Sequence, residues 1–431
     1  MDWIEVAILT LSFLCLILIG VPVAWSIGLS TLATMLINIP ALPALTTIAQ
    51  RMATGLDSFS LLAIPFFVLA GNLMNSGGIA KRLIDFAKAL IGSLPGGLAH
   101  VNIIAAMLFG AISGSAVAAA SAIGGIMTKR MEQEGFSRPF AAAVNITAST
   151  TGLVIPPSNI LIIYSLASGG VSIAALFLAG YLPGLLIGVF LMLTAGIWAM
   201  WRGFPRGESI KLRQVWKTGW SAFPSLMLLV IVMGGIVGGI FTATEASAIA
   251  VVYTLLLSAV YRAISWKGLY AVILHSASTT AIVMLLIGCS MSMSWIMAYE
   301  NIPQSITDSL LSLSDNKWVI LLIINLILLF VGIFMDMTPA VLIFTPIFLP
   351  VVTKLGMNPV HFGIVMVMNL CIGLCTPPVG SVLFIGVSVA GTTIQKVIRP
   401  LLPLFIAMLI TLLLVTYIPA LSLYLPTFFG F

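Results

Sequence analysis

The sequence predicts an all-α integral membrane protein built from two inverted repeats. Three observations predict this class: a very apolar composition, a proline pair that occurs twice in matching surroundings, and a one-sided distribution of basic residues. Of the 431 residues, 61% are hydrophobic and 7% are charged. No soluble domain of this length has such a composition, and several apolar runs are long enough to cross a bilayer.

The two proline pairs lie within apolar stretches and belong to one element that occurs twice. Residues 152–159 read GLVIPPSN, and residues 373–380, which lie 221 positions later (from 152 to 373), read GLCTPPVG. Proline cannot donate a backbone amide, so a membrane helix breaks at each pair. Such a break is tolerated at membrane depth where the freed groups meet protein or line a cavity. A broken helix in both halves therefore points to the binding site of a carrier.

The apolar runs predict about ten spanning helices, two re-entrant hairpins and amphipathic arm helices. In the first repeat, residues 1–201, the hairpin is expected at about 98–128 and the broken helix at about 139–168. In the second repeat, residues 218–431, the hairpin is expected at about 320–352 and the broken helix at about 360–390. A cytoplasmic linker, 202–217, joins the repeats. The other expected spans are 5–21, 22–38, 58–76, 173–201, 222–241, 245–262, 268–298 and 400–425, with an arm at 78–95.

An odd number of crossings in each repeat makes the second repeat enter the membrane from the opposite side. With the linker in the cytoplasm, 15 of the 18 lysine and arginine residues lie on that side, and Arg51, Lys317 and Lys354 lie outside. This distribution agrees with the positive-inside rule, which was not used to choose the spans. Both termini are therefore expected in the periplasm. The net charge of +6 reflects this orientation and does not indicate nucleic-acid binding.

The hairpin tips carry polar groups that suit a cation. Ser113 and Ser115 lie in the first tip, and Ser115 aligns with Asp336 in the second tip, close to Thr338. Hydroxyl, carboxylate and carbonyl oxygens are the ligands that hard cations prefer. A carboxylate within the membrane is costly unless it is paired or serves an ion path, so Asp336 predicts function. Glu245, the other acid expected within the membrane, stands at a helix start, where a structural cap or an interhelical bond is the favoured interpretation.

Each tip is expected to meet the broken helix of its own repeat and to form a cation site there. The first site is expected to contain Ser113, Ser115, Gly152, Val154 and Pro157. The second site is expected to contain Asp336, Thr338, Gly373, Cys375 and Pro378. Helix amino ends between the sites would attract an anionic substrate. The polar residues expected to complete the substrate pocket are Asn145, Thr147, Ser158, Asn159, Asn369 and Thr376.

With these residues in view, the chain resembles the large membrane subunit of the tripartite ATP-independent periplasmic (TRAP) transporters, the DctM-like family. The resemblance covers essentially the whole chain. It implies sodium-driven import of an organic acid anion, such as a C4-dicarboxylate, a sialic acid or another sugar acid, by an elevator movement. It also implies sodium ions at the two cation sites and no cofactor. Its most specific stretches are 62–72, 110–115, 154–159, 239–246, 336–339 and 376–380.

The resemblance further implies a location in the bacterial inner membrane and two protein partners. These partners are a small four-helix membrane subunit and a periplasmic binding protein that delivers the substrate. Because the chain begins directly at the large subunit, a separate small subunit is expected. The residues themselves leave open a stand-alone sodium-coupled anion carrier of a related elevator family, and a channel is less compatible with two non-equivalent halves. An intramembrane enzyme is a remote alternative, because the spans contain no Ser/Lys, Asp/Asp or zinc constellation.

Overall fold

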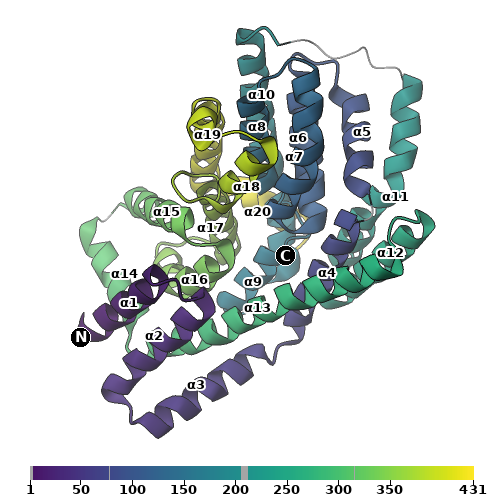
Figure 1. The fold of residues 1–431 in the computed structure, drawn as a ribbon. Coiled ribbons are helices and arrows are strands. Elements are labelled where there is room, and N and C mark those ends of the chain that lie inside the picture. Colours follow the sequence, from purple (N-terminus) through teal and green to yellow (C-terminus); the bar gives the residue numbers. More distant parts are fainter. Residues whose placement is uncertain (1–2, 77, 205–211, 315) are drawn as a thin grey trace.

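The computed structural model describes residues 3–76, 78–204, 212–314 and 316–431, and this part of the chain is built of helices (Figure 1). Eight helical segments in it are long and apolar enough to cross a membrane. The all-helical membrane class predicted from composition is therefore confirmed. The linker expected at 202–217 lies partly outside the described residues, at 205–211.

The first half of the chain contains ten α-helices and one short 3-10 helix in its described residues. They are α1 (Trp3–Leu18), α2 (Val23–Asn38), α3 (Ala41–Leu56), η1 (Phe59–Leu62), α4 (Ala63–Ser76), α5 (Ile79–Ile91), α6 (Gly97–Ser113), α7 (Ala116–Gln133), α8 (Arg138–Thr151), α9 (Asn159–Ala167) and α10 (Ile173–Trp201). Helices α6 and α7 form the first hairpin, and α8 and α9 form the first broken helix.

The second half repeats this order of helices. It contains α11 (Leu212–Val237), α12 (Ala243–Val260), α13 (Trp266–Tyr299), α14 (Ile302–Leu313), α15 (Lys317–Phe334), α16 (Met337–Lys354), α17 (Pro359–Gly373), α18 (Ser381–Ala390), α19 (Ile394–Tyr417) and α20 (Ala420–Phe428). Most helix boundaries recur at the offset of 221 residues. For example, α7 and α16 begin at Ala116 and Met337, and α10 and α19 begin at Ile173 and Ile394.

Helix α13 is the main departure from this repetition. It is continuous over 34 residues, whereas the corresponding part of the first half is divided into α3, η1 and α4. The division falls at Asp57 and Ser58, which have non-helical backbone angles. Helix α3 lies in a stretch, 39–57, for which the sequence predicted no element. The expected span at 400–425 is also not one helix, because α19 ends at Tyr417 and α20 begins after Pro419.

Glu245 caps α12, as predicted. Its carboxylate accepts a hydrogen bond from the Thr242 amide at 2.8 Å, and the Thr242 hydroxyl accepts one from the Glu245 amide at 3.3 Å. This reciprocal arrangement is a capping box, which satisfies two backbone donors at the helix start. The acid therefore has a structural role in helix initiation.

The helices pack into two groups that are joined by the arms α5 and α14. In one group α12 packs on α4, and α13 packs on α2, α3 and α4, past which it runs obliquely in Figure 1. In the other group α6 and α7 pack on α8, α15 packs on α17, and α19 packs on α8 and α10. Arm α5 contacts α6 and α11, and arm α14 contacts α16 and α13. Helix α11 packs on α12 of the first group and α16 packs on α17 of the second, so each arm touches both groups. The groups also meet directly where α13 packs on α16.

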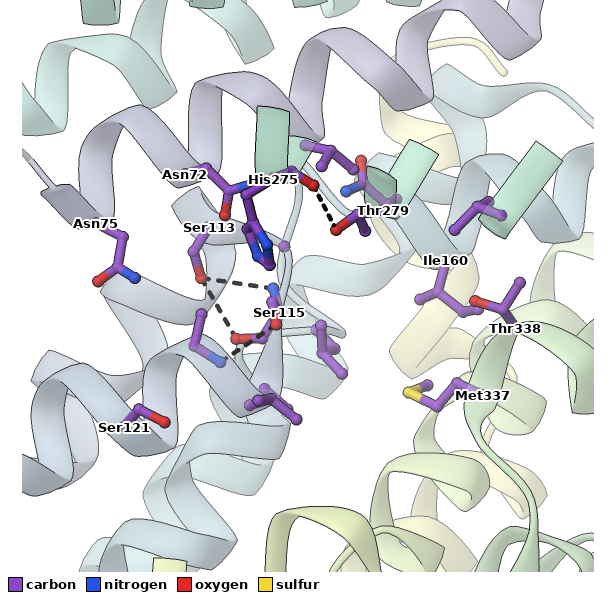
Figure 2. A pocket seen from close by; sticks show the side chains of 18 of the residues that line it. Asn72, Asn75, Ser113, Ser115, Ser121, Ile160, His275, Thr279, Met337 and Thr338 are labelled. Carbon is purple, nitrogen blue, oxygen red and sulfur yellow. Dashed lines mark hydrogen bonds between the residues drawn. The ribbon is translucent and has the colours of Figure 1, made fainter. Parts of the chain in front are cut away.

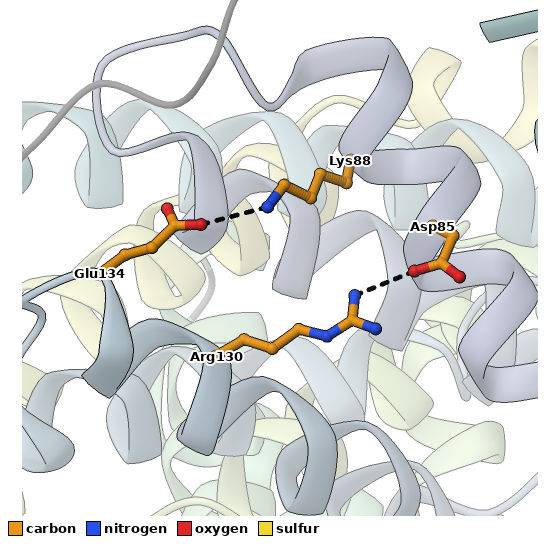
Figure 3. Close-up of polar contacts among 4 residues, drawn as sticks. All are labelled: Asp85, Lys88, Arg130 and Glu134. Atoms are coloured by element: carbon orange, nitrogen blue, oxygen red, sulfur yellow. Dashed lines mark hydrogen bonds and ion pairs between the residues drawn. The ribbon is translucent and has the colours of Figure 1, made fainter. Parts of the chain in front are cut away.

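Two ion pairs hold arm α5 against hairpin helix α7 (Figure 3). Lys88 Nζ lies 3.1 Å from Glu134 Oε1, and Arg130 Nη1 lies 3.0 Å from Asp85 Oδ1. On the side of the first group, the Arg82 guanidinium lies 3.2 Å from the ring centre of Tyr261, the C-cap residue of α12. Arm α5 is therefore connected to both groups by charged side chains.

The Asp85–Arg130 pair is expected to contribute little to stability, because both side chains are partly exposed. In a double-mutant cycle of Asp85→Asn and Arg130→Gln, thermal unfolding in detergent should give a coupling energy of about 0.5 kcal/mol, and less at high salt. A coupling well above about 1 kcal/mol would show that this pair is more than an ordinary surface ion pair.

Candidate functional site

A cavity of about 760 Å³ is lined by both hairpin tips and by both broken helices. The first tip contributes Ser113, Gly114 and Ser115, and the second contributes Asp336, Met337 and Thr338. Asn159 and Ser381 reach the cavity from α9 and α18. The remaining wall comes largely from α4 and α13, as Figure 2 shows. Segments more than 200 residues apart in the chain therefore meet around one space.

The first tip is a tight turn stabilised by its own serines. Helix α6 ends at Ser113, Gly114 turns the chain with a φ of 63°, and Ser115 caps α7. The Ser115 hydroxyl accepts a hydrogen bond from the Ala118 amide at 3.2 Å, and the Ser113 hydroxyl accepts one from the Ser115 amide at 3.5 Å. A side chain at position 114 would lie 2.9 Å from Nδ2 of Asn159. Glycine therefore allows both the turn and the approach of Asn159.

The second tip places a carboxylate in the cavity. Asp336 occupies the N-cap position of α16, where the partial positive charge of the helix end favours an anionic group. Its side chain is accessible from the cavity, and Thr338 lines the cavity in the first turn of α16. Among the described residues, no lysine, arginine or histidine lies within ion-pairing distance of Asp336. The carboxylate is therefore available to a cation.

Each hairpin touches the broken helix of its own half through a pair of glycines. A Cβ added at Gly110 of α6 would lie 2.9 Å from the Cα of Gly152, which follows α8. A Cβ added at Gly373 of α17 would lie 2.6 Å from the Cα of Gly332 of α15. Real side chains do not approach backbone atoms so closely, so these contacts require glycine. They bring each tip beside the loop that contains the proline pair.

The proline loops are closed by local hydrogen bonds. Both proline pairs, 156–157 and 377–378, are joined by cis peptide bonds. The hydroxyl of Ser158 donates to the carbonyl of Leu153 at 2.5 Å, and that of Thr376 donates to the carbonyl of Ile372 at 2.8 Å. Pro157 is buried and Pro378 is exposed. The carbonyl oxygen of Val154 packs against Gly180 of α10. A larger residue at position 180 would displace this carbonyl.

Five of the residues predicted for the sites line the cavity. These residues are Ser113, Ser115, Asn159, Asp336 and Thr338. The glycines 152 and 373 lie behind the tips, and the remaining predicted residues are not part of the cavity lining. Sodium binding at the two tips stays a prediction. The hydroxyl and carboxylate oxygens of the tips suit a hard cation.

Several of the predicted residues outside the cavity bond between or within helices. Nδ2 of Asn145 donates to the carbonyl of Ala120 on α7 at 2.8 Å, and the Thr147 hydroxyl donates to Ala143 within α8 at 2.9 Å. Nδ2 of Asn369 donates to the backbone carbonyl of Asn325 on α15 at 2.8 Å. The Cys375 thiol points toward the hydroxyl of Thr150 on α8, at 3.4 Å. These four side chains are buried between helices.

Sequence reasoning missed the polar residues that α4 and α13 present to the cavity. Asn72 and Asn75 come from α4, and His275 and Thr279 come from α13. Nδ2 of Asn72 donates to the hydroxyl of Ser276 at 2.9 Å, which fixes α4 against α13 beside His275. The signal was present, because a histidine and an asparagine interrupt otherwise apolar spans.

The sequence profile of the family described as "Tripartite ATP-independent periplasmic transporter, DctM component" matches residues 10–421. The chain belongs to this family. The YgiK protein of Salmonella typhimurium is 57% identical over 97% of this chain and 96% of its own length. The C4-dicarboxylate TRAP transporter large permease protein DctM of Rhodobacter capsulatus is 39% identical over 97% of this chain and 98% of its own length.

The crystal structure of the YdaH transporter of Alcanivorax borkumensis has a similar fold. It superposes with a TM-score of 0.67 at 14% identity, and the match covers 95% of this chain and 97% of that one. This DctM component is therefore a multi-pass membrane protein with a transporter fold. Its family places it among transport components and not among enzymes.

Proposed function

We propose that this DctM component is the large permease subunit of a TRAP transporter and imports an organic acid anion with sodium ions. The observation that carries the proposal is the convergence of both tips and both broken helices on one cavity. Broken helices and re-entrant tips present backbone dipoles and carbonyl oxygens at membrane depth, and this is how carriers bind ions and substrates.

The charge in the cavity supports coupling to a cation. Asp336 faces the cavity, and no lysine or arginine is among the described residues that line it. An acid anion entering alone would be repelled by the carboxylate in a medium of low dielectric constant. Sodium bound at the tips removes this repulsion, and the anion in return strengthens sodium binding, since such coupling is reciprocal.

Two observations support an inverted-repeat topology and an elevator movement. The helices fall into two packed groups joined by α5 and α14, and in the proposed movement the group with the tips slides against the group of α4, α12 and α13. Residues assigned to the outer side also lie together. Nδ2 of Asn38 donates to both Glu5 and Glu300, and Lys354 lies 3.6 Å from Asp308. The repeats are 1–201 and 218–431, with both termini in the periplasm.

The family supports a proposal for the partners and substrate of this subunit. We propose that it acts in the bacterial inner membrane with a small four-helix membrane subunit and a periplasmic binding protein. One relative is named for C4-dicarboxylate transport, which supports an organic acid as the substrate. A sialic acid or another sugar acid fits the same cavity chemistry.

Uptake into proteoliposomes tests the proposal. The large subunit is reconstituted with the small subunit and binding protein of its own operon, and uptake of labelled succinate, N-acetylneuraminate and gluconate is measured. We expect uptake of one acid with an inward sodium gradient and none with choline in place of sodium. Equal uptake without sodium would refute the coupling. Undiminished uptake without the binding protein would instead identify a stand-alone carrier.

Ser115→Ala tests the first cation site. Loss of one hydroxyl ligand is expected to raise the sodium concentration for half-maximal uptake about three- to tenfold. The control is Ser312→Ala, an exposed position on arm α14 whose hydroxyl bonds only within its own helix in the described structure. An unchanged sodium titration in the Ser115 variant would remove this hydroxyl from the site.

A further inference from the structure

The two ends of the cavity differ in charge. The second tip carries Asp336, and the first tip carries uncharged Ser115 at the corresponding position. An anion is therefore repelled less strongly at the first tip than at the second. The first tip also has an amide donor beside it, because Nδ2 of Asn159 lies next to Gly114.

His275 enters the cavity from the wall that faces the first tip. In Figure 2 its imidazole points from α13 toward the turn that carries Ser113 and Ser115. The side chain is exposed to the cavity, and its ring has no hydrogen-bond partner in the part of the chain that the structure describes. Of the basic residue types, histidine alone is found among the described residues of the lining, and only at position 275.

The backbone around His275 is held firmly. The Thr279 hydroxyl donates to the His275 carbonyl at 3.0 Å, and the next residue, Ser276, accepts a hydrogen bond from Asn72 of α4. The imidazole therefore projects from a fixed point of the wall into the open space. Because the backbone is held, a ligand has to order only the His275 side chain, which limits the entropy lost on binding.

We propose that His275 binds the carboxylate of the transported acid. Its imidazole N–H donates to a carboxylate oxygen at the first tip, and the Asn159 amide is a second donor. The acid is then oriented with its carboxylate toward the first tip and away from Asp336. This assignment rests on the proposed transport of an organic acid and adds the residue and the orientation.

The proposal gives α13 a direct role in substrate recognition. Helix α13 packs on α2, α3 and α4 of the first group and also contacts α16, which begins at the second tip in the other group. A carboxylate held by both His275 and Asn159 would bridge the two groups in the arrangement seen in this structure. Movement of the tips along α13 would break this bridge and weaken binding.

Uptake by variants tests the assignment with the acid that the wild-type system transports. His275→Ala is expected to raise the half-saturating concentration of that acid at least about tenfold, since it removes a hydrogen bond to a charged group. His275→Gln keeps an N–H donor and is expected to restore part of the affinity. The matched control is Ser278→Ala, an exposed position on the same helix that is not part of the described lining. An unchanged half-saturating concentration in His275→Ala would overturn the inference.

A binding measurement separates this inference from the proposed transport. Thr279→Cys, in a Cys15→Ser background, places a thiol in the cavity wall, since the other native cysteines are buried. The acid in sodium buffer should protect this thiol from a water-soluble maleimide. Adding His275→Ala should raise the half-protecting concentration at least about tenfold. Equal protection with and without His275 would overturn the inference alone. Wild-type protein that transports none of the three acids would overturn the proposed function, and the inference with it.

Discussion

Asp336→Asn is expected to abolish sodium-driven uptake while the subunit still folds and inserts. The carboxylate faces the cavity and forms no ion pair in the described structure. Its removal therefore leaves no buried cation unpaired there. Asparagine keeps the shape and can still occupy an N-cap position, but it removes the negative charge that a sodium ion would neutralise. We expect uptake at physiological sodium to fall about 100-fold, which lies in the upper part of the usual range for coupled sites.

The measurement is initial uptake in proteoliposomes as a function of sodium concentration, together with expression level and thermal stability in detergent. Asp308→Asn is the matched control, because Asp308 is exposed on arm α14 and pairs with Lys354 at 3.6 Å. It should change uptake less than twofold, as expected for a surface ion pair of low energy. Wild-type uptake in the Asp336 variant would remove this residue from the mechanism.

Gly373→Val is expected to destabilise the protein strongly. An added Cβ would lie 2.6 Å from both the Cα and the carbonyl carbon of Gly332, so backbone would have to move. Overpacking of this kind costs about 1–3 kcal/mol or more, and here it would also separate the second tip from its proline loop. The expected result is a lower thermal midpoint in detergent and a reduced yield of monodisperse protein.

Gly125→Ala is the matched control for this substitution. Gly125 lies within helix α7, and a Cβ added there meets nothing within 4 Å. Alanine is favoured over glycine within a helix by about 0.5–1 kcal/mol, so this variant should be as stable as the wild type or slightly more stable. A thermal midpoint in Gly373→Val equal to that of the control would show that the contact between α15 and α17 is not tight.

The features predicted correctly from the sequence are those that local chemistry determines. A proline pair breaks a helix, so the interruptions between α8 and α9 and between α17 and α18 followed from two short motifs. The first hairpin was expected at a tip rich in small residues, and the second because it lies 221 residues later in the repeat. Glu245 was interpreted as a cap because a carboxylate at a helix start suits the helix dipole, and the structure shows the capping box with Thr242.

Other features depend on tertiary packing and could not be predicted from the sequence in the same way. Helix α8 is buried on all sides from Phe140 to Thr151, so its sequence has no polar face that would show which side chains reach the cavity. Asn145 and Thr147 were therefore predicted as substrate ligands, although they bond to α7 and within α8. Helix α3 was missed because it is too polar for a span and follows Pro40 directly.

The wall formed by α4 and α13 was missed for another reason. The repeat relates matching elements of the two halves, and the proline pairs single out only the residues beside them. His275 has no polar ring counterpart in the first half, where Thr54 occupies the corresponding position on α3. Only the fold shows that the N-terminal half of α13 lines the cavity together with the tips.

The unbroken length of α13 has a consequence for the surrounding lipid. At 1.5 Å per residue, its 34 residues extend about 51 Å, compared with a hydrocarbon layer of about 30 Å. A membrane helix of this length tilts, extends beyond the hydrocarbon layer or deforms the lipid around it. Packing on α2, α3 and α4 also constrains the tilt of α13, so a change in bilayer thickness strains the helix and the lipid around it. Transport rates should therefore be compared only between liposomes whose acyl chains have the same length.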